Sequence, residues 1–221
     1  MVEAIRSCAK AREGKTKVTV DVHPDYPEWR GIDVKGKKIA WQKDPTFDEL
    51  EKAGGEVQKH AEPHTVSEDT FHITGEIPRV TEYETGLPQI RWMPESRSWE
   101  PDPLIMDERF VAVHVKDKGL VVFTGCSHAG LVNVCKHARE AFPDIPLHAV
   151  VGGFHLAGHN EARIEPTIND LKDDNTRPQL FLPGHCTGWR ARGALEMAFP
   201  DSVIPIGAGN TIFIGQPNHL A

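Results

Sequence analysis

Three histidines in the second half of the chain each follow an apolar segment and a glycine. Imidazole is the commonest metal ligand in proteins, and a crevice lined by several imidazoles suits zinc or iron. The apolar segments are short and rich in β-branched or large residues, which predicts buried strands that end at one edge of a sheet. The sequence therefore predicts one shared metal site, although glycine–histidine turns can also be no more than tight connections. The three residues are His128, His155 and His185.

Two cysteines accompany these histidines, because Cys126 lies two residues before His128 and Cys186 follows His185. A thiolate is a good zinc ligand, so Cys126 is a further candidate for the metal site. Nucleophilic thiol chemistry at either cysteine, with a nearby histidine, is a weaker alternative. Serine-hydrolase chemistry is set aside, because the second glycine of a G-x-S-x-G motif would have to lie one residue before Gly130.

The elements that position this site are predicted from the spacing of apolar residues. Residues 120–124 predict a buried strand, and residues 131–142 have apolar side chains at helical spacing up to Pro143. Residues 109–115 are expected to pair with the strand as a hairpin. Later in the chain, strands are predicted at 148–151, 179–182, 203–206 and 211–214, and helices at 166–172 and 189–199.

The first half of the chain is more polar, and the elements predicted there are shorter. Residues 28–38 predict a surface loop, and residues 81–103 predict a long irregular loop of the kind that forms lids or binding segments. The other expected elements are a helix over Met1–Arg12, a strand over 17–22, a helix from Asp44-Pro45-Thr46 to Ala53, and short strands at 57–64 and 70–74.

Two residues of the first half are candidates for contact with a substrate. Arg79 follows Pro78, which cannot continue a central strand, and its guanidinium offers a planar set of donors suited to an anionic group. His23 lies at the end of a predicted strand and could face the same site, although a histidine in a turn is more often solvated.

Composition excludes several classes of protein. The chain has 221 residues, of which 39% are hydrophobic and 26% charged, as in a globular protein. Its net charge of -7 and its lack of a Lys/Arg cluster argue against nucleic-acid binding. Its apolar runs are too short for a membrane span, and four scattered cysteines do not form a disulfide framework. We expect a cytoplasmic protein that acts on a small molecule.

Five blocks of residues occur in order between about Val18 and Ile214. They are Thr74-Gly75-Glu76-Ile77-Pro78-Arg79, Met106-Asp107-Glu108-Arg109, Phe123-Thr124-Gly125-Cys126-Ser127-His128-Ala129-Gly130, Gly152-Gly153-Phe154-His155-Leu156 and Pro183-Gly184-His185-Cys186-Thr187-Gly188. Together they resemble the metallo-β-lactamase-fold hydrolases, and within them the branch related to dihydropterin-ribofuranosylaminobenzene-phosphate synthases. The combination is specific, although each block alone is not.

The resemblance implies an α+β fold in which two mixed sheets and outer helices form an αββα sandwich, here a single domain over residues 1–221. It also implies one or two metal ions, usually zinc, with iron or manganese also possible. The metal activates a water against a small ester, lactone, amide or phosphate-containing substrate.

By position, the resemblance makes His128 and His185 metal ligands and His155 a further ligand or a supporting group. Cys126 would stand where many members of the family carry a bridging aspartate. Glu76 belongs to the same block as Arg79, and we predict that both, with His23, contact the substrate.

The sequence departs from the family in one respect, because no H-x-H-x-D-H motif occurs among its residues. We therefore expect that the chain begins downstream of that motif and lacks the first strands of one sheet. An exposed apolar edge would favour a homo-oligomer or a longer partner. The alternative function is a non-catalytic metal-binding or interaction protein, in which four N/S ligands hold a structural zinc ion.

Overall fold

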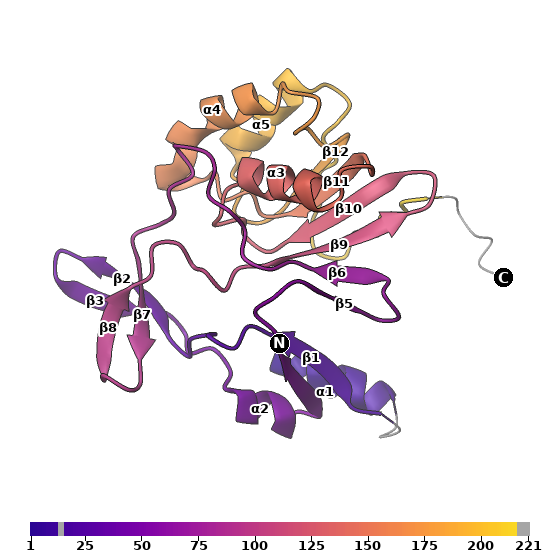
Figure 1. Ribbon diagram of the computed structural model, residues 1–221. Helices are drawn as coiled ribbons and strands as arrows, with labels where there is room; N and C mark the ends of the chain where they lie inside the picture. The colour runs from indigo at the N-terminus through magenta and orange to yellow at the C-terminus, as the bar shows by residue number, and fades with distance from the viewer. Residues whose placement is uncertain (13–15, 216–221) are drawn as a thin grey trace. The chain divides into compact units, whose positions relative to one another are not determined.

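The computed structural model describes residues 1–12 and 16–215 (Figure 1). The chain forms two compact units. The first comprises Met1–Glu62 and Leu87–Pro103, and the second comprises Pro63–Gly86 and the chain from Leu104 onward. Helices and sheets of both strand directions are present, which confirms the predicted α+β class. None of the helices in the described residues is long and apolar enough to cross a bilayer.

The second unit is built on a sheet with the strand order β12-β11-β10-β9-β6-β5. Strands β9 and β10 pair antiparallel as the predicted hairpin, whereas β10, β11 and β12 are parallel neighbours. The strands are β5 (His64–Val66), β6 (Phe71–Ile73), β9 (Phe110–Val115), β10 (Gly119–Thr124), β11 (Leu147–Gly152) and β12 (Leu180–Pro183).

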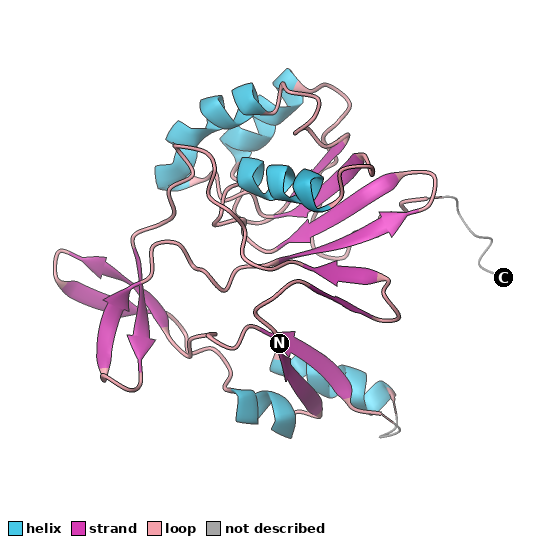
Figure 2. Cartoon of the chain, in the orientation of Figure 1, coloured by secondary structure: helices cyan, strands magenta, loops and turns pink. Residues whose placement is uncertain are grey.

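Three helices cover one face of this sheet (Figure 2). Successive residues of a strand point to opposite faces, so Val122 packs in the core beneath the helices while Val121 faces the other side. Neither valine is accessible to solvent, which confirms the predicted buried strand. The helices are α3 (Leu131–Ala141), α4 (Ile164–Asp170) and α5 (Trp189–Ala198), with a 3-10 turn at Gly158–Arg163 before α4.

The opposite face of the sheet is partly covered by residues 204–214. Ile204, Ile206 and Ile214 pack against the cluster that contains Val121. The prediction of strands at 203–206 and 211–214 was wrong. The described residues there form only one β-bridge, between Phe181 and Val203. Apolar alternation is retained, but Pro205 has no amide hydrogen to extend a ladder.

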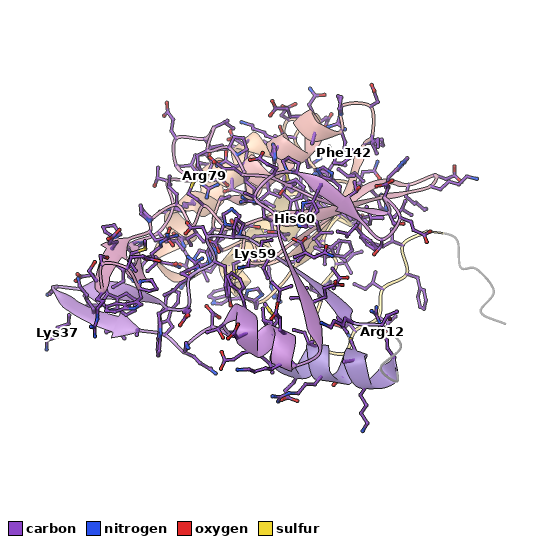
Figure 3. The ribbon with its side chains drawn as sticks, turned by 60° about the horizontal axis from the view of Figure 1, so that its bottom comes forward. Arg12, Lys37, Lys59, His60, Arg79 and Phe142 are labelled. Carbon is purple, nitrogen blue, oxygen red and sulfur yellow. The ribbon has the colours of Figure 1, made fainter. Side chains whose placement is uncertain are left out.

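The first unit contains a small core of its own. Helix α1 (Val2–Ala11) and helix α2 (Phe47–Lys52) pack on the parallel pair β1 (Val18–Val22) and β4 (Gly55–Lys59). The predicted cap of α2 is confirmed, since Thr46 and Glu49 form a capping box. Beyond α2, Lys59 and His60 follow each other at the end of β4 (Figure 3), where the Lys59 Nζ lies 3.7 Å from the Phe47 ring centroid.

Two segments that were predicted to be loops, 28–38 and 81–103, contain strands of the first unit. They form a sheet with the order β3-β2-β7-β8, in which the strands are β2 (Arg30–Val34), β3 (Lys37–Ala40), β7 (Gln89–Met93) and β8 (Ser98–Pro101). These strands are polar and short, so no apolar alternation reveals them. Cross-strand contacts hold them, including Trp92 with Trp99 at 5.7 Å between ring centroids and an Arg30–Asp102 ion pair at 2.6 Å. The strand predicted at 57–64 is likewise divided between β4 and β5.

Candidate metal centre

The candidate ligands lie on three loops of the second unit. Cys126 and His128 follow β10, His155 follows β11, and His185 and Cys186 follow β12. Because β10, β11 and β12 are parallel neighbours, their carboxyl ends meet at one edge of the sheet. The fold therefore brings the three loops together at one edge of the sheet, as the sequence predicted.

The side chains at this edge converge. The ligand atoms of Cys126, His128 and His155 lie within 4.8 Å of one another, and so do those of Cys126, His185 and Cys186. The Cys126 Sγ is 2.9 Å from the His185 Nε2, and the His128 and His155 rings are 4.7 Å apart between centroids. All four predicted metal ligands thus come together, and Cys186 joins them. We call these five residues the thiol–imidazole cluster.

The donor atoms of the cluster suit zinc. Zinc bonds of about 2.0–2.1 Å to nitrogen and about 2.3 Å to sulfur place tetrahedral ligands about 3.3–3.8 Å apart, so small side-chain movements would bring these ligands into range. The His155 Nδ1 is buried and has no hydrogen-bond partner among the described residues. A buried imidazole nitrogen without a partner is costly in a protein, and a metal ion would satisfy it.

Glu108 holds His128 in a defined orientation. Its carboxylate accepts hydrogen bonds from the backbone amides of His128 (2.7 Å) and Ala129 (2.6 Å), and lies 2.9 Å from the His128 Nδ1. Burial raises the pKa of Glu108, but the hydrogen bonds from His128 and Ala129 outweigh it and leave that pKa below its ordinary value. With Nδ1 directed at the carboxylate, the Nε2 of His128 is the nitrogen left for a metal.

Glycines allow the loops to approach one another. A Cβ on Gly152 would lie 2.1 Å from the Thr124 carbonyl oxygen, and a Cβ on Gly153 would lie 2.4 Å from the Cys186 Sγ. The Gly153 amide also donates to the Gly125 carbonyl (2.8 Å), which joins the loops after β10 and β11. The glycines that drew attention in the sequence are therefore needed for close approach.

The two thiols shift each other's pKa in opposite directions. The hydrogen bond from Cys126 lowers the pKa of Cys186 strongly, against the opposing effect of burial, and a hydrogen bond from His155 adds to the lowering. The same contact with Cys186, together with burial, raises the pKa of Cys126. Thiolate is the form of cysteine that binds zinc, so the lowered pKa of Cys186 favours it as a ligand.

A buried carboxylate supports the turn that carries His128. Glu84 accepts hydrogen bonds from the backbone amides of Val132 (3.0 Å) and Asn133 (2.9 Å) at the start of α3. Burial raises the pKa of Glu84 in spite of these donors. Gly130 lies against the same carboxylate, because a Cβ there would be 2.0 Å from the Glu84 Cδ.

Two of the three predicted substrate-binding residues have contacts of their own within the chain. The Arg79 guanidinium donates to the Ile77 carbonyl oxygen at 2.6 Å and also to that of Leu104, and burial lowers its pKa (Figure 3). Glu76 is exposed in the same segment. His23 belongs to the other unit, where its Nδ1 accepts a hydrogen bond from the Asp25 amide at 3.1 Å. Contact of these three residues with a substrate stays a prediction.

Sequence reasoning missed three residues of the centre. Glu108 lies in one of the five blocks but received no role, and Glu84 was assigned to an irregular loop. Cys186 was considered only for thiol chemistry, although its place beside His185 was a usable signal. The two carboxylates could not be found from spacing, because their partners lie 20 and 48 residues away along the chain.

Comparison with known structures assigns the fold. The chain superposes on the crystal structure of a metal-dependent hydrolase of the β-lactamase superfamily with a TM-score of 0.74 and 21% sequence identity. The superposition covers 91% of this chain and 73% of the other. The protein therefore has the metallo-β-lactamase fold that its sequence blocks indicated.

A curated relative agrees with the branch that the blocks resemble. It is the 7,8-dihydropterin-6-methyl-4-(β-D-ribofuranosyl)-aminobenzene-5′-phosphate synthase of Methanocaldococcus jannaschii, which is 34% identical over 108 residues. The matched region covers 49% of this chain and 36% of that enzyme, so the likeness spans about a third of the relative. A scan against protein-family models found no match.

Proposed function

We propose that the thiol–imidazole cluster binds one or two divalent metal ions, with zinc first and iron or manganese as alternatives. We further propose that the centre hydrolyses a small ester, lactone, amide or phosphate-containing substrate. The observation that carries this proposal is the convergence of five N/S ligands on three neighbouring strand ends of this fold.

A divalent metal at this centre would supply a water of lowered pKa for hydrolysis. The chain's own residues contribute orientation and charge. Glu108 fixes the tautomer of His128 by accepting from its Nδ1, so that the Nε2 faces the cluster. Cys126 belongs to both groups of three ligands, so it is the side chain placed to be shared by two ions.

The proposal is tested by measuring metal content and hydrolysis together. The purified chain is loaded with zinc, dialysed and analysed by inductively coupled plasma mass spectrometry, then assayed with lactone, ester and phosphodiester probes. We expect bound zinc that falls several-fold in His128→Ala and His185→Ala. The rate of hydrolysis should fall together with the zinc content, because metal binding and hydrolysis would depend on the same ligands.

His114→Ala is the matched control, because His114 is an exposed histidine of β9 in the same unit. It should retain the metal content and activity of the parent chain. Equal metal content in the parent, His128→Ala and His185→Ala would contradict the proposal, provided that circular dichroism shows all three folded.

A synthase reaction is the second candidate, favoured by the printed name of the Methanocaldococcus jannaschii relative. The test is to incubate the metal-loaded chain with a 7,8-dihydropterin that carries a leaving group on its 6-methyl carbon and with a 4-(β-D-ribofuranosyl)aminobenzene 5′-phosphate, whose amine would displace that group. Mass spectrometry would then reveal a coupled product. Such a product without turnover of the hydrolytic probes would favour the synthase over the hydrolase.

The third candidate is a metal-binding or interaction protein without catalysis, which four N/S ligands closed around one zinc ion would support. Bound metal without turnover of any probe would favour it. Assembly into a homo-oligomer belongs to this candidate, and sedimentation of a monomer would count against it. The cytoplasmic location expected from the sequence stays a prediction.

A further inference from the structure

Two of the four cysteines are placed to react with each other. The Cys126 and Cys186 sulfurs lie within 4.8 Å, and both side chains are partly exposed. Cys8 is exposed in the first unit, whereas Cys135 is fully buried in the core of the second. The chain therefore carries one thiol pair and, in Cys8, an accessible thiol for comparison.

The two sulfurs are close enough that a small movement would bring them to bonding distance. The absent side chain of Gly153 leaves the space that the Cys186 Sγ occupies, and that sulfur lies 3.5 Å from the Cys126 carbonyl oxygen. A disulfide bond is about 2.05 Å long, so the sulfurs need to move together by less than about 3 Å. Both cysteines lie on loops that follow strands, where such movement disturbs no ladder.

We propose that Cys126 and Cys186 form an intramolecular disulfide by exchange with a low-molecular-weight disulfide. The Cys186 thiolate attacks one sulfur of the oxidant, its S–S bond breaks, and one small thiol leaves. Cys126 then attacks the Cys186 sulfur of the mixed disulfide and displaces the second small thiol. Two protein thiols are oxidised and one small disulfide is reduced to two thiols.

A neighbouring imidazole favours the second step. The His185 Nε2, 2.9 Å from the Cys126 Sγ, is placed to accept the proton that Cys126 loses on attack. Since the product uses both thiols, a disulfide and a thiolate–metal centre exclude each other; this consequence rests on the proposed function, whereas the disulfide itself does not.

The pair is tested on the full, purified chain after treatment with a chelator and then with oxidised glutathione. We expect an intact mass lower by two hydrogens, and two fewer sites that react with an alkylating reagent under denaturing conditions. Peptide mapping should recover one cross-link, between Cys126 and Cys186. Persistent reduction of both thiols, separate glutathione adducts on each, or a cross-link to Cys8 would overturn the inference.

Two cysteine variants distinguish disulfide exchange between Cys126 and Cys186 from a general reactivity of the thiols with glutathione. Cys126→Ser should trap a stable glutathione adduct on Cys186, while Cys8→Ser should form the cross-link as the parent chain does. If the serine variant fails to fold, the peptide map of the parent chain still decides the question.

Zinc distinguishes this inference from the proposed function. Saturating zinc should slow disulfide formation at least about tenfold if the thiols are ligands, because bound thiolates are not free nucleophiles. Rapid cross-linking that zinc does not slow would support the disulfide while contradicting the metal centre.

Discussion

At the scale of single residues, the orientation of His128 is the best-defined feature of the centre. Glu108 receives three contacts from two consecutive residues, and its side chain is only 9% exposed. A carboxylate that accepts from Nδ1 fixes the ring and makes the opposite nitrogen a better ligand. The residue is therefore expected to act on metal affinity through His128 rather than by direct contact.

Glu108→Gln should weaken zinc binding by about 10–100-fold, because a neutral amide no longer polarises the imidazole. Competition with a chromophoric chelator measures the dissociation constant. Glu140→Gln, at an exposed position of α3, is the matched control and should bind zinc like the parent chain. An unchanged dissociation constant in folded Glu108→Gln would refute the positioning role.

The metal ligands could be predicted because each lies a few residues after the end of a strand, so a short stretch of sequence is enough to identify it. His128, His155 and His185 needed only an apolar segment and a glycine to be recognised. Glu84 and Glu108 are non-local, since they meet their partners only when distant segments fold together. Sequence spacing carries no information about such pairs without the fold.

At the scale of elements, the start of α3 depends on a carboxylate from another segment. Gly130 has no side chain to cap the helix, and Glu84 takes that role from outside it. The carboxylate also complements the positive end of the helix dipole. The loop before α3 carries His128, so the cap links helix stability to the metal centre.

Glu84→Ala should destabilise the second unit by about 2–4 kcal/mol, because two buried amides lose their acceptor. Urea unfolding followed by far-ultraviolet circular dichroism measures the change. Glu165→Ala, at an exposed position of α4, provides the comparison and should shift stability by less than about 0.5 kcal/mol. Similar shifts in both variants would show that Glu84 does not cap the helix.

Two histidines of the second unit make its stability depend on pH. Burial lowers the pKa of His72 on β6 and of His137 on α3 below the ordinary value of about 6.5. The unfolded chain therefore binds more protons in this range. The free energy of unfolding is therefore highest above pH about 6.5. It falls as the pH drops toward the lowered pKa values of the two histidines.

His137→Gln should flatten this dependence, since one of the two groups no longer titrates. The measurement is the urea midpoint between pH about 7.5 and 5.5, compared with the parent chain and with His114→Gln. Parallel curves for the parent chain and His137→Gln would contradict the assignment, whatever the absolute stability of the variant.

The elements that were predicted correctly are those with a strong apolar period, such as β10 and α3. The missed strands β2, β3, β7 and β8 are held by cross-strand aromatic and ionic pairs, which leave no periodic signal. The opposite error occurred at 203–206, where alternating isoleucines pack on the sheet but Pro205 interrupts the backbone pairing. Apolar patterns therefore reported burial more reliably than they reported strands.

At the scale of the whole molecule, all five members of the thiol–imidazole cluster belong to the second unit. The first unit has its own small core around Leu50 and Val20. The metallo-β-lactamase fold could be predicted from the order of the five blocks, whereas the division into two compact units could not. The single domain expected over residues 1–221 and a homo-oligomer stay predictions.

Zinc should raise the melting temperature of the parent chain by about 5–10 °C at a concentration about 100 times the dissociation constant. Binding to the folded state alone produces this effect, so a chelator should reverse it. The double variant His128→Ala/His185→Ala should show no rise, whereas His114→Ala should respond as the parent does. A rise of equal size in the double variant would place zinc outside the cluster.

The most direct test of the metal centre is anomalous diffraction at the zinc absorption edge from crystals of the zinc-loaded chain. Our account predicts an anomalous peak at the carboxyl ends of β10, β11 and β12, about 2.0–2.3 Å from imidazole nitrogens and a thiolate of the cluster. A well-ordered cluster without a peak, or zinc bound only at other residues, would contradict it.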